Sequence, residues 1–235
     1  MSIGFLKFIC PAALSFATAA HAADQAPFTS ATISGLGARN IGSATMSGRI
    51  SAIAAKREPS GKITIFVGAA SGGVWKSEDG GTLYRPVFDE QPVQSIGAVA
   101  LDPNNSKKLW VGTGESWTRN TVSLGDGIYK SIDGGDTWSN SGLNNAERIA
   151  HIVVSPKSSD TVYAAVPGPL WSDSPDRGLY KTTDGGKNWN LVLKGSNLST
   201  GCSTVALDPN DPNVIFASLW DFRRKGWTFR SGGDC

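Results

Sequence analysis

The chain contains few of the residues on which most metal and redox sites depend. Its 235 residues include only two histidines, three cysteines and two methionines. His21 falls in an N-terminal segment that we expect to be removed, so His151 is left as the one histidine and multi-histidine zinc sites are excluded by number. We therefore expect no metal site and no cofactor. Because His151 alternates with apolar residues, it is predicted to be a hydrogen-bonded core histidine rather than a base.

An excess of charge of one sign is also missing. Lys and Arg number 22 against 20 Asp and Glu, which leaves a formal net charge of +2. Such a balance provides no basic excess to neutralise phosphates, so no nucleic-acid partner is expected. Beyond the N-terminus the sequence has no apolar run of about 18 residues, and no transmembrane segment is expected.

The first 22 residues have the pattern of a secretory signal peptide. Lys7 precedes an apolar run that ends in the small residues of "AHA" at Ala22, which indicates a cleaved leader rather than a membrane span. We therefore expect a secreted or periplasmic protein, with a polar entry segment at 23–43. In such an oxidising compartment Cys202 and Cys235 are able to pair, and the sequence leaves this pairing open.

One short stretch occurs three times. It reads "KSEDGGTLY" at 76–84, "KSIDGGDTW" at 130–138 and "KTTDGGKNW" at 181–189. A spacing of roughly 50 residues is typical of repeat architectures. Two strand-like runs precede each copy, a third strand ends in it and a fourth follows it, and four short strands per repeat predict one blade of a β-propeller.

The predicted fold class is therefore all-β, a β-propeller. Three complete four-stranded blades are expected at about 44–90, 91–145 and 146–195, followed by an incomplete blade at 196–235. Propellers typically close with about four to eight blades. We expect this chain to be a fragment whose partners include the remaining blades of a longer protein.

The repeated motif is predicted to be structural. A catalytic residue is needed once per site, whereas this motif occurs once in each complete blade. Its hydroxyl and carboxylate groups suit hydrogen bonds across a tight turn, and its glycines adopt conformations closed to other residues. The residues assigned to this role are Ser77, Asp79, Gly80, Ser131, Asp133, Gly134, Trp138, Thr182, Asp184, Gly185 and Trp189.

The motif resembles the Asp-box of bacterial neuraminidase repeats. The wider frame, including "IFVGAASGGVWKSEDGG" and "WDFRRKGWTFRSGG", resembles the secreted bacterial sortilin-like propellers, which are often labelled glycosyl hydrolases. The resemblance implies a propeller and leaves two functions open. One is a scaffold that binds a peptide, protein or glycan. The alternative is a sialidase-like or xyloglucanase-like glycoside hydrolase acting on extracellular or periplasmic polysaccharide.

A ligand site is expected in the loops at the end of the blades opposite the Asp-boxes, because these loops differ most between blades. Trp117, Trp171 and Trp220 occupy comparable places there, each beside charged residues, as suits carbohydrate or peptide binding. The loop of the fourth blade is predicted to be "LWDFRRKGW". The expected ligand-binding residues are Arg49, Glu115, Trp117, Arg119, Arg148, Trp171, Asp221 and Arg223.

Two features of this set bear on chemistry. Arg49 and Arg148 each precede the first strand of a blade. They are expected either to form salt bridges with neighbouring loops or, as a pair at the channel mouth, to favour a carboxylate ligand. A glycosidase would instead need two carboxylates flanking the scissile bond. The candidates for that role are Glu115, Asp126 and Asp221.

Overall fold

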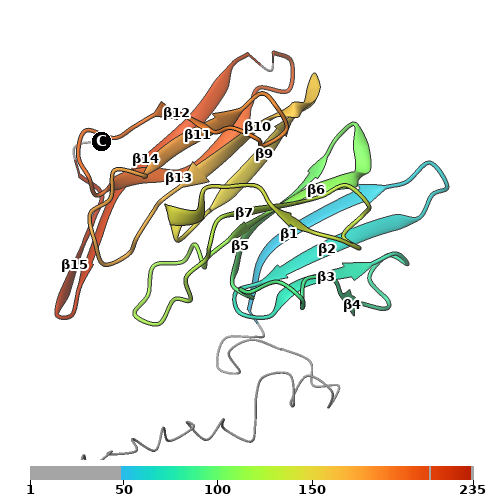
Figure 1. The fold of residues 1–235 in the computed structure, drawn as a ribbon, viewed down its shortest axis with the longest axis horizontal. Helices are drawn as coiled ribbons and strands as arrows, with labels where there is room; N and C mark the ends of the chain where they lie inside the picture. Colours follow the sequence, from blue (N-terminus) through green and yellow to red (C-terminus); the bar gives the residue numbers. More distant parts are fainter. Residues whose placement is uncertain (1–48, 212, 234–235) are drawn as a thin grey trace, which may run out of the picture. The chain divides into compact units, whose positions relative to one another are not determined.

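The computed structural model describes residues 49–211 and 213–233. The expected signal peptide (1–22), the polar entry segment (23–43) and Cys235 lie outside these residues. In the described part the chain is all-β apart from one 3-10 turn, η1 (Asn144–Ala146). Three four-stranded antiparallel sheets and one three-stranded sheet follow one another along the chain (Figure 1), which confirms the predicted propeller-type fold.

Each sheet forms one blade, and its strands pair in chain order. The first blade contains β1 (Ile50–Arg57), β2 (Ile63–Ala69), β3 (Gly73–Ser77) and β4 (Arg85–Pro86). The second contains β5 (Ile96–Asp102), β6 (Asn105–Thr113), β7 (Ile128–Ser131) and β8 (Ser139–Asn140). The third contains β9 (His151–Ser155), β10 (Ser158–Val166), β11 (Gly178–Thr182) and β12 (Asn190–Leu193), and the fourth contains β13 (Thr200–Leu207), β14 (Ile215–Lys225) and β15 (Thr228–Ser231).

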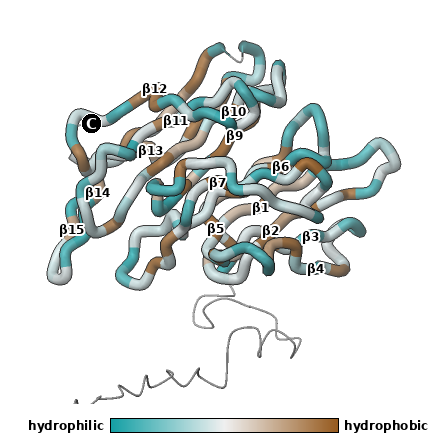
Figure 2. Tube along the Cα trace, viewed as in Figure 1, coloured by the Kyte–Doolittle hydropathy of each residue, from teal (hydrophilic) through white to brown (hydrophobic). Residues whose placement is uncertain are grey.

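Neighbouring blades pack through shared apolar cores. Phe66 and Leu109 lie in the core between the first and second blades, Trp110 in the core between the second and third, and Tyr163 and Val205 in the core between the third and fourth. Figure 2 shows apolar residues along the strands and polar residues at most turns. Large side chains thus fill the spaces between blades.

The turns formed by the repeated Asp-Gly-Gly motif, called Asp-box turns below after the motif they resemble, follow β3, β7 and β11 and use the same hydrogen bonds each time. In the second blade, the Ser131 hydroxyl donates to Asp133 Oδ1 at 2.8 Å and accepts from the Gly135 amide at 2.8 Å. Asp133 Oδ1 also accepts from the Thr137 amide at 2.9 Å. The carboxylate is therefore engaged within its own turn. The corresponding pairs in the other turns are Ser77 with Asp79 and Thr182 with Asp184.

The Asp-boxes of the second and third blades also hold these blades against the preceding one. Trp189 Nε1 donates to the carbonyl oxygen of Ser141 at 2.7 Å, and Trp138 makes the same type of bond to the first blade at 2.6 Å. The second glycine of the motif lies against the preceding blade, since a Cβ atom on Gly186 would come within 2.6 Å of the Trp110 ring. Gly186 also has a φ of +88°, which other residues rarely adopt.

The fourth blade differs from the sequence prediction. The stretch "LWDFRRKGW", predicted to be a loop, continues strand β14 and forms a hairpin with β15. The reason is a period-two alternation, which places Trp220 and Phe222 on one face and Asp221 and Arg223 on the other. Gly226 lies in the tight turn that joins the two strands.

The described residues contain neither a metal-binding cluster nor a membrane-spanning helix. No group of three or more His, Cys, Asp or Glu side chains in this part of the chain is arranged to hold a metal ion. No helix there is long and apolar enough to cross a bilayer.

Candidate functional site

Glu115 connects two arginines at the loop end of the first two blades. Its side chain is fully buried after β6 and forms ion pairs with Arg49, immediately before β1, and with Arg119 at 2.9 Å. The Arg49 guanidinium lies 5.0 Å from the centroid of the Trp117 ring, where a cation is attracted to the ring face. Arg49, Glu115, Trp117 and Arg119 are called the Glu115 cluster below. All four belong to the predicted ligand-binding set.

A groove of about 310 Å³ lies beside this cluster. It is lined by Trp117 from the second blade, Pro167 from the third and Trp220 from the fourth. Trp117 is 63% exposed, which is unusual for a ring of this size. Indole rings from two blades thus line one shallow groove, here called the Trp groove. Its other lining residues are Ser116, Thr118, Ala150 and Ser203.

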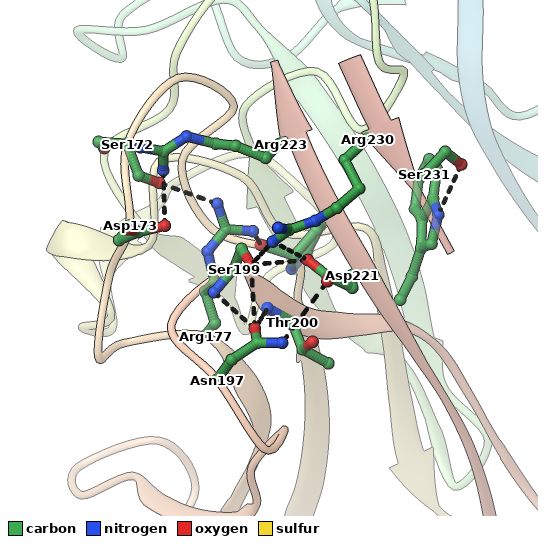
Figure 3. A network of polar contacts seen from close by, with 12 residues as sticks. Ser172, Asp173, Arg177, Asn197, Ser199, Thr200, Asp221, Arg223, Arg230 and Ser231 are labelled. Carbon is green, nitrogen blue, oxygen red and sulfur yellow. Dashed lines mark hydrogen bonds and ion pairs between the residues drawn. The ribbon is translucent and has the colours of Figure 1, made fainter. Parts of the chain in front are cut away.

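Asp221 is the centre of a second cluster, at the base of the β14–β15 hairpin (Figure 3). Its carboxylate is buried and accepts hydrogen bonds from Ser199 Oγ at 2.6 Å and from Arg230 at 2.9 Å. Burial raises the pKa of Asp221, but the hydrogen bonds from Ser199 and Arg230 outweigh this and hold it below its ordinary value. The carboxylate therefore stays ionised and ties the hairpin to the segment before β13.

The loop after β10 is held by two arginines, also visible in Figure 3. Arg223 on the hairpin forms an ion pair with Asp173 at 2.8 Å. Arg177 is almost fully buried and donates to the carbonyl oxygens of Pro167 and, at 3.0 Å, of Ser172. These contacts fix the position of Pro167, one of the residues that line the Trp groove.

Arg148 does not reach the channel mouth where the sequence predicted it. It is fully buried, because the loop after β10 folds over it, and its Nε donates to the carbonyl oxygen of Gly168 at 2.7 Å. Burial, together with the nearby charge of Arg177, lowers the pKa of Arg148 to about 10. Since Arg49 is paired with Glu115, the two predicted arginines do not converge on a common anion.

The remaining candidate carboxylate, Asp126, is engaged in local contacts. It accepts hydrogen bonds from the Tyr129 hydroxyl at 2.7 Å and from Thr113 Oγ1 at 3.3 Å. Burial and this carboxylate raise the pKa of Tyr129 to about 12. Asp126 thus holds the loop before β7 against the end of β6.

His151 departs from its prediction in one respect. Its Nδ1 lies 2.9 Å from Thr204 Oγ1, so the expected hydrogen bond is present. The side chain is exposed rather than buried in the core, because His151 is the first residue of β9 and burial in this strand begins at Ile152. The buried thiol in the same region is Cys202, whose pKa is raised to about 11 by burial.

The structure brings together part of the predicted set and adds residues that were not predicted. Trp171 is 45% exposed on its loop but does not line the Trp groove. The added residues are Arg230 and Ser199 around Asp221. Trp220, which the sequence grouped with Trp117 and Trp171 but not with the ligand-binding set, lines the groove. The alternation of aromatic and charged residues from Trp220 onward is a sequence signal for the hairpin that carries Trp220 and Arg230.

Parts of the sequence are similar to proteins named as xyloglucanases. Over 101 residues, 40% of this chain, the sequence is 34% identical to a probable oligoxyloglucan-reducing end-specific xyloglucanase of Neosartorya fischeri. Over 129 residues, half of the chain, it is 32% identical to a xyloglucanase of Hypocrea jecorina. The matched stretches span only 10% and 14% of those two proteins. No protein-family model matches the chain.

Solved structures show the same fold. An ancestral GH74 enzyme covers 78% of this chain with a TM-score of 0.57 and 20% identity, and this chain covers 23% of that enzyme. A GH74 enzyme of Niastella koreensis covers 75% with a TM-score of 0.53 and 23% identity, and 27% of its own length is covered. These relatives support a resemblance to glycoside hydrolase propellers, rather than to the sortilin-like or neuraminidase proteins named from the motif.

Proposed function

We propose that this chain is part of an exported glycoside hydrolase propeller that binds a polysaccharide such as xyloglucan, with the Trp groove as one sugar-binding surface. The observation that carries the proposal is the presence of Trp117 and Trp220 on one shallow groove. Flat indole rings present large, rigid apolar surfaces with a polar edge, and such a surface suits a sugar ring with its hydroxyl groups at the rim.

The surroundings of the groove support binding through preorganisation. Arg49 lies over Trp117 and is itself paired with the buried Glu115, so the ring is held before any ligand arrives. Pro167, on the opposite blade, is held by the buried Arg177. A rigid site loses less conformational entropy when a ligand binds.

The relatives favour a hydrolase over a noncatalytic scaffold, because those matched in sequence are named xyloglucanases. The three candidate carboxylates, however, are engaged in structural contacts. Glu115 is bound by two arginines, Asp221 by Ser199 and Arg230, and Asp126 by Tyr129. We therefore assign glycan binding to the described residues and propose that the hydrolytic pair lies elsewhere in a longer polypeptide.

Isothermal titration of the chain with xyloglucan oligosaccharides tests the proposal. Trp117→Ala and Trp220→Ala are each expected to weaken binding by about fivefold, since an aromatic contact of this kind contributes on the order of 1 kcal/mol. The matched control is Trp227→Ala, which removes an indole that is 85% exposed at the hairpin tip and outside the groove.

Three results would contradict the proposal. They are an absence of saccharide binding, binding that both groove variants retain, or an equal loss in the Trp227→Ala control. Circular dichroism of each variant separates a lost contact from unfolding. An assay for new reducing ends on xyloglucan, run on the same samples, measures whether the chain alone cleaves its ligand.

A further inference from the structure

We propose that the outer edge of β14, from Ile215 to Leu219, docks one further β-strand with the pattern Gly-apolar-aromatic-Lys-Ser/Thr-x-Asp-Gly-Gly. The strand is supplied by a further stretch of the same polypeptide. This interaction surface is independent of glycan binding in the Trp groove, and it follows from the register of the four blades.

Strand β15 does not occupy the position of β3, β7 and β11. In the complete blades, the residue that opens the Asp-box pairs near the start of the second strand; the pairs are Ser77 with Ile65, Ser131 with Leu109 and Thr182 with Val162. The equivalent position in the fourth blade is Ile215, which pairs with Leu207 on its inner side. β15 pairs only with Phe222–Lys225. Within the described residues, Ile215–Leu219 therefore has a strand on its inner side alone.

Phe216 shows what is missing at this edge. It pairs with Ala206 as Trp110 pairs with Ala100, so the two aromatic residues occupy the same register position. Trp110 is fully buried, whereas Phe216 is 61% exposed. The other residues at this position, Phe66 and Tyr163, are also buried.

A lysine from the third strand covers the aromatic ring in each complete blade. Lys130 Nζ lies 5.0 Å from the centroid of the Trp110 ring, and the two residues pair across the sheet. The same arrangement joins Lys76 to Phe66 at 5.7 Å and Lys181 to Tyr163 at 5.3 Å. Phe216 is the fourth aromatic of the series, and its edge therefore fits a strand that carries a lysine at this position.

The Asp-box part of the pattern follows from the contacts of the same lysines with the next blade. Lys130 Nζ donates to the carbonyl oxygen of Gly185, in the Asp-box of the third blade, at 3.0 Å. A Cβ atom on Gly134, in the Asp-box of the second blade, would lie 3.4 Å from Lys76 Nζ. Lys181 of the third blade has no such neighbour, because the described part of the fourth blade contains no Asp-box. A strand on β14 that ends in Asp-Gly-Gly would bring this turn to Lys181.

The complete blades favour a strand from the same polypeptide. Each of the three third strands in place is provided by the same chain as the sheet that it joins. The curated relatives are also far longer than this chain, since the stretch matched in the first covers only 10% of that protein. An exposed strand edge offers unpaired backbone groups to any such segment.

The chain's own third strand provides a probe. A fluorescent peptide with the sequence of residues 178–189, "GLYKTTDGGKNW", is titrated into the chain, and anisotropy and amide hydrogen exchange are measured. We expect saturable binding with one peptide per chain, and slower exchange confined to residues 215–219. A peptide with alanine in place of the lysine and the aspartate is expected to bind about tenfold more weakly.

Two protein variants make the test specific. Phe216→Lys alters an exposed side chain and is expected to abolish peptide binding, because it opposes the incoming lysine. Trp227→Lys, the matched control, replaces an exposed aromatic residue away from this edge and is expected to bind normally. Equal binding by both peptides, no effect of Phe216→Lys, or no saturable binding would overturn the proposal. A dimer of the free chain that Phe216→Lys dissociates would assign the edge to a second copy and also overturn it.

Discussion

The carboxylates at the two ends of the blades are held in different ways. In the Asp-box turns, Asp133 is bound by Ser131 and Thr137, which lie two and four residues away. At the loop end, Glu115 is bound by Arg49, which lies 66 residues away, and Asp221 by Ser199, 22 residues away. The first arrangement stabilises one turn, whereas the second joins separate segments. Removal of a loop-end carboxylate should therefore destabilise the contact between two segments, whereas removal of an Asp-box carboxylate destabilises one turn.

The largest effect is expected for Glu115→Ala. The substitution leaves two arginines without their shared partner and removes a buried side chain, at a cost of about 2 to 3 kcal/mol in unfolding free energy because both arginines keep some contact with water. Urea unfolding measures this cost. Glu115→Gln keeps the shape of the side chain and serves as the control for lost packing. A cost below about 0.5 kcal/mol for Glu115→Ala would show that the cluster does not join the blades.

A smaller effect is expected for Asp133→Ala. The Ser131 hydroxyl and the Thr137 amide lose their acceptor, and a turn that also packs on the preceding blade is weakened by about 1 to 2 kcal/mol. Thermal unfolding measures the loss. Ile132→Ala, at the neighbouring residue that is 64% exposed, is the matched control and should leave the melting temperature nearly unchanged. Glycan binding in the Trp groove should persist in both variants.

Acid should weaken the Asp-box turns. Hydrogen bonds from Thr137 lower the pKa of Asp133 from 3.8 to about 2, and comparable bonds lower the pKa values of Asp79 and Asp184. Because the folded pKa lies below the unfolded one, the stabilisation is complete above about pH 4 and is lost as the pH falls toward about 2. Melting temperatures measured across this range should fall less steeply for Asp133→Asn than for the unaltered chain. Parallel curves would contradict this origin.

The smallest effect is expected at the exposed ion pair between Arg223 and Asp173. The Asp173 side chain is 57% exposed, so Asp173→Ala should cost no more than about 0.5 kcal/mol. Even this loss should vanish in about 1 M salt, where charges are screened within about 3 Å. Thermal unfolding at low and high salt checks both statements. A cost as large as that of Glu115→Ala would mean that burial does not decide which loop contacts matter.

Much of the fold could be predicted from the sequence. Turn residues and alternating strands are local signals, and the Asp-box motif marks the end of the third strand in each complete blade. The fourth blade was predicted less well, because its β14–β15 hairpin has no counterpart in the repeated pattern of the other three blades. The ligand-binding set was predicted by residue type and loop position, which is why Trp117 and Arg148 appeared equivalent although one is exposed and the other buried.

The sequence by itself determined the Asp-box turns and the order of the strands, because these depend on residues within a few positions of one another. Only the tertiary structure decided that Arg49 pairs with Glu115 and that Trp117 and Trp220 line one groove. It also decided that β15 pairs with Phe222–Lys225, beyond the part of β14 that pairs with β13. These contacts join residues far apart in the chain. The geometry of these contacts depends on how the large side chains between neighbouring sheets pack. Local sequence propensity does not determine that packing.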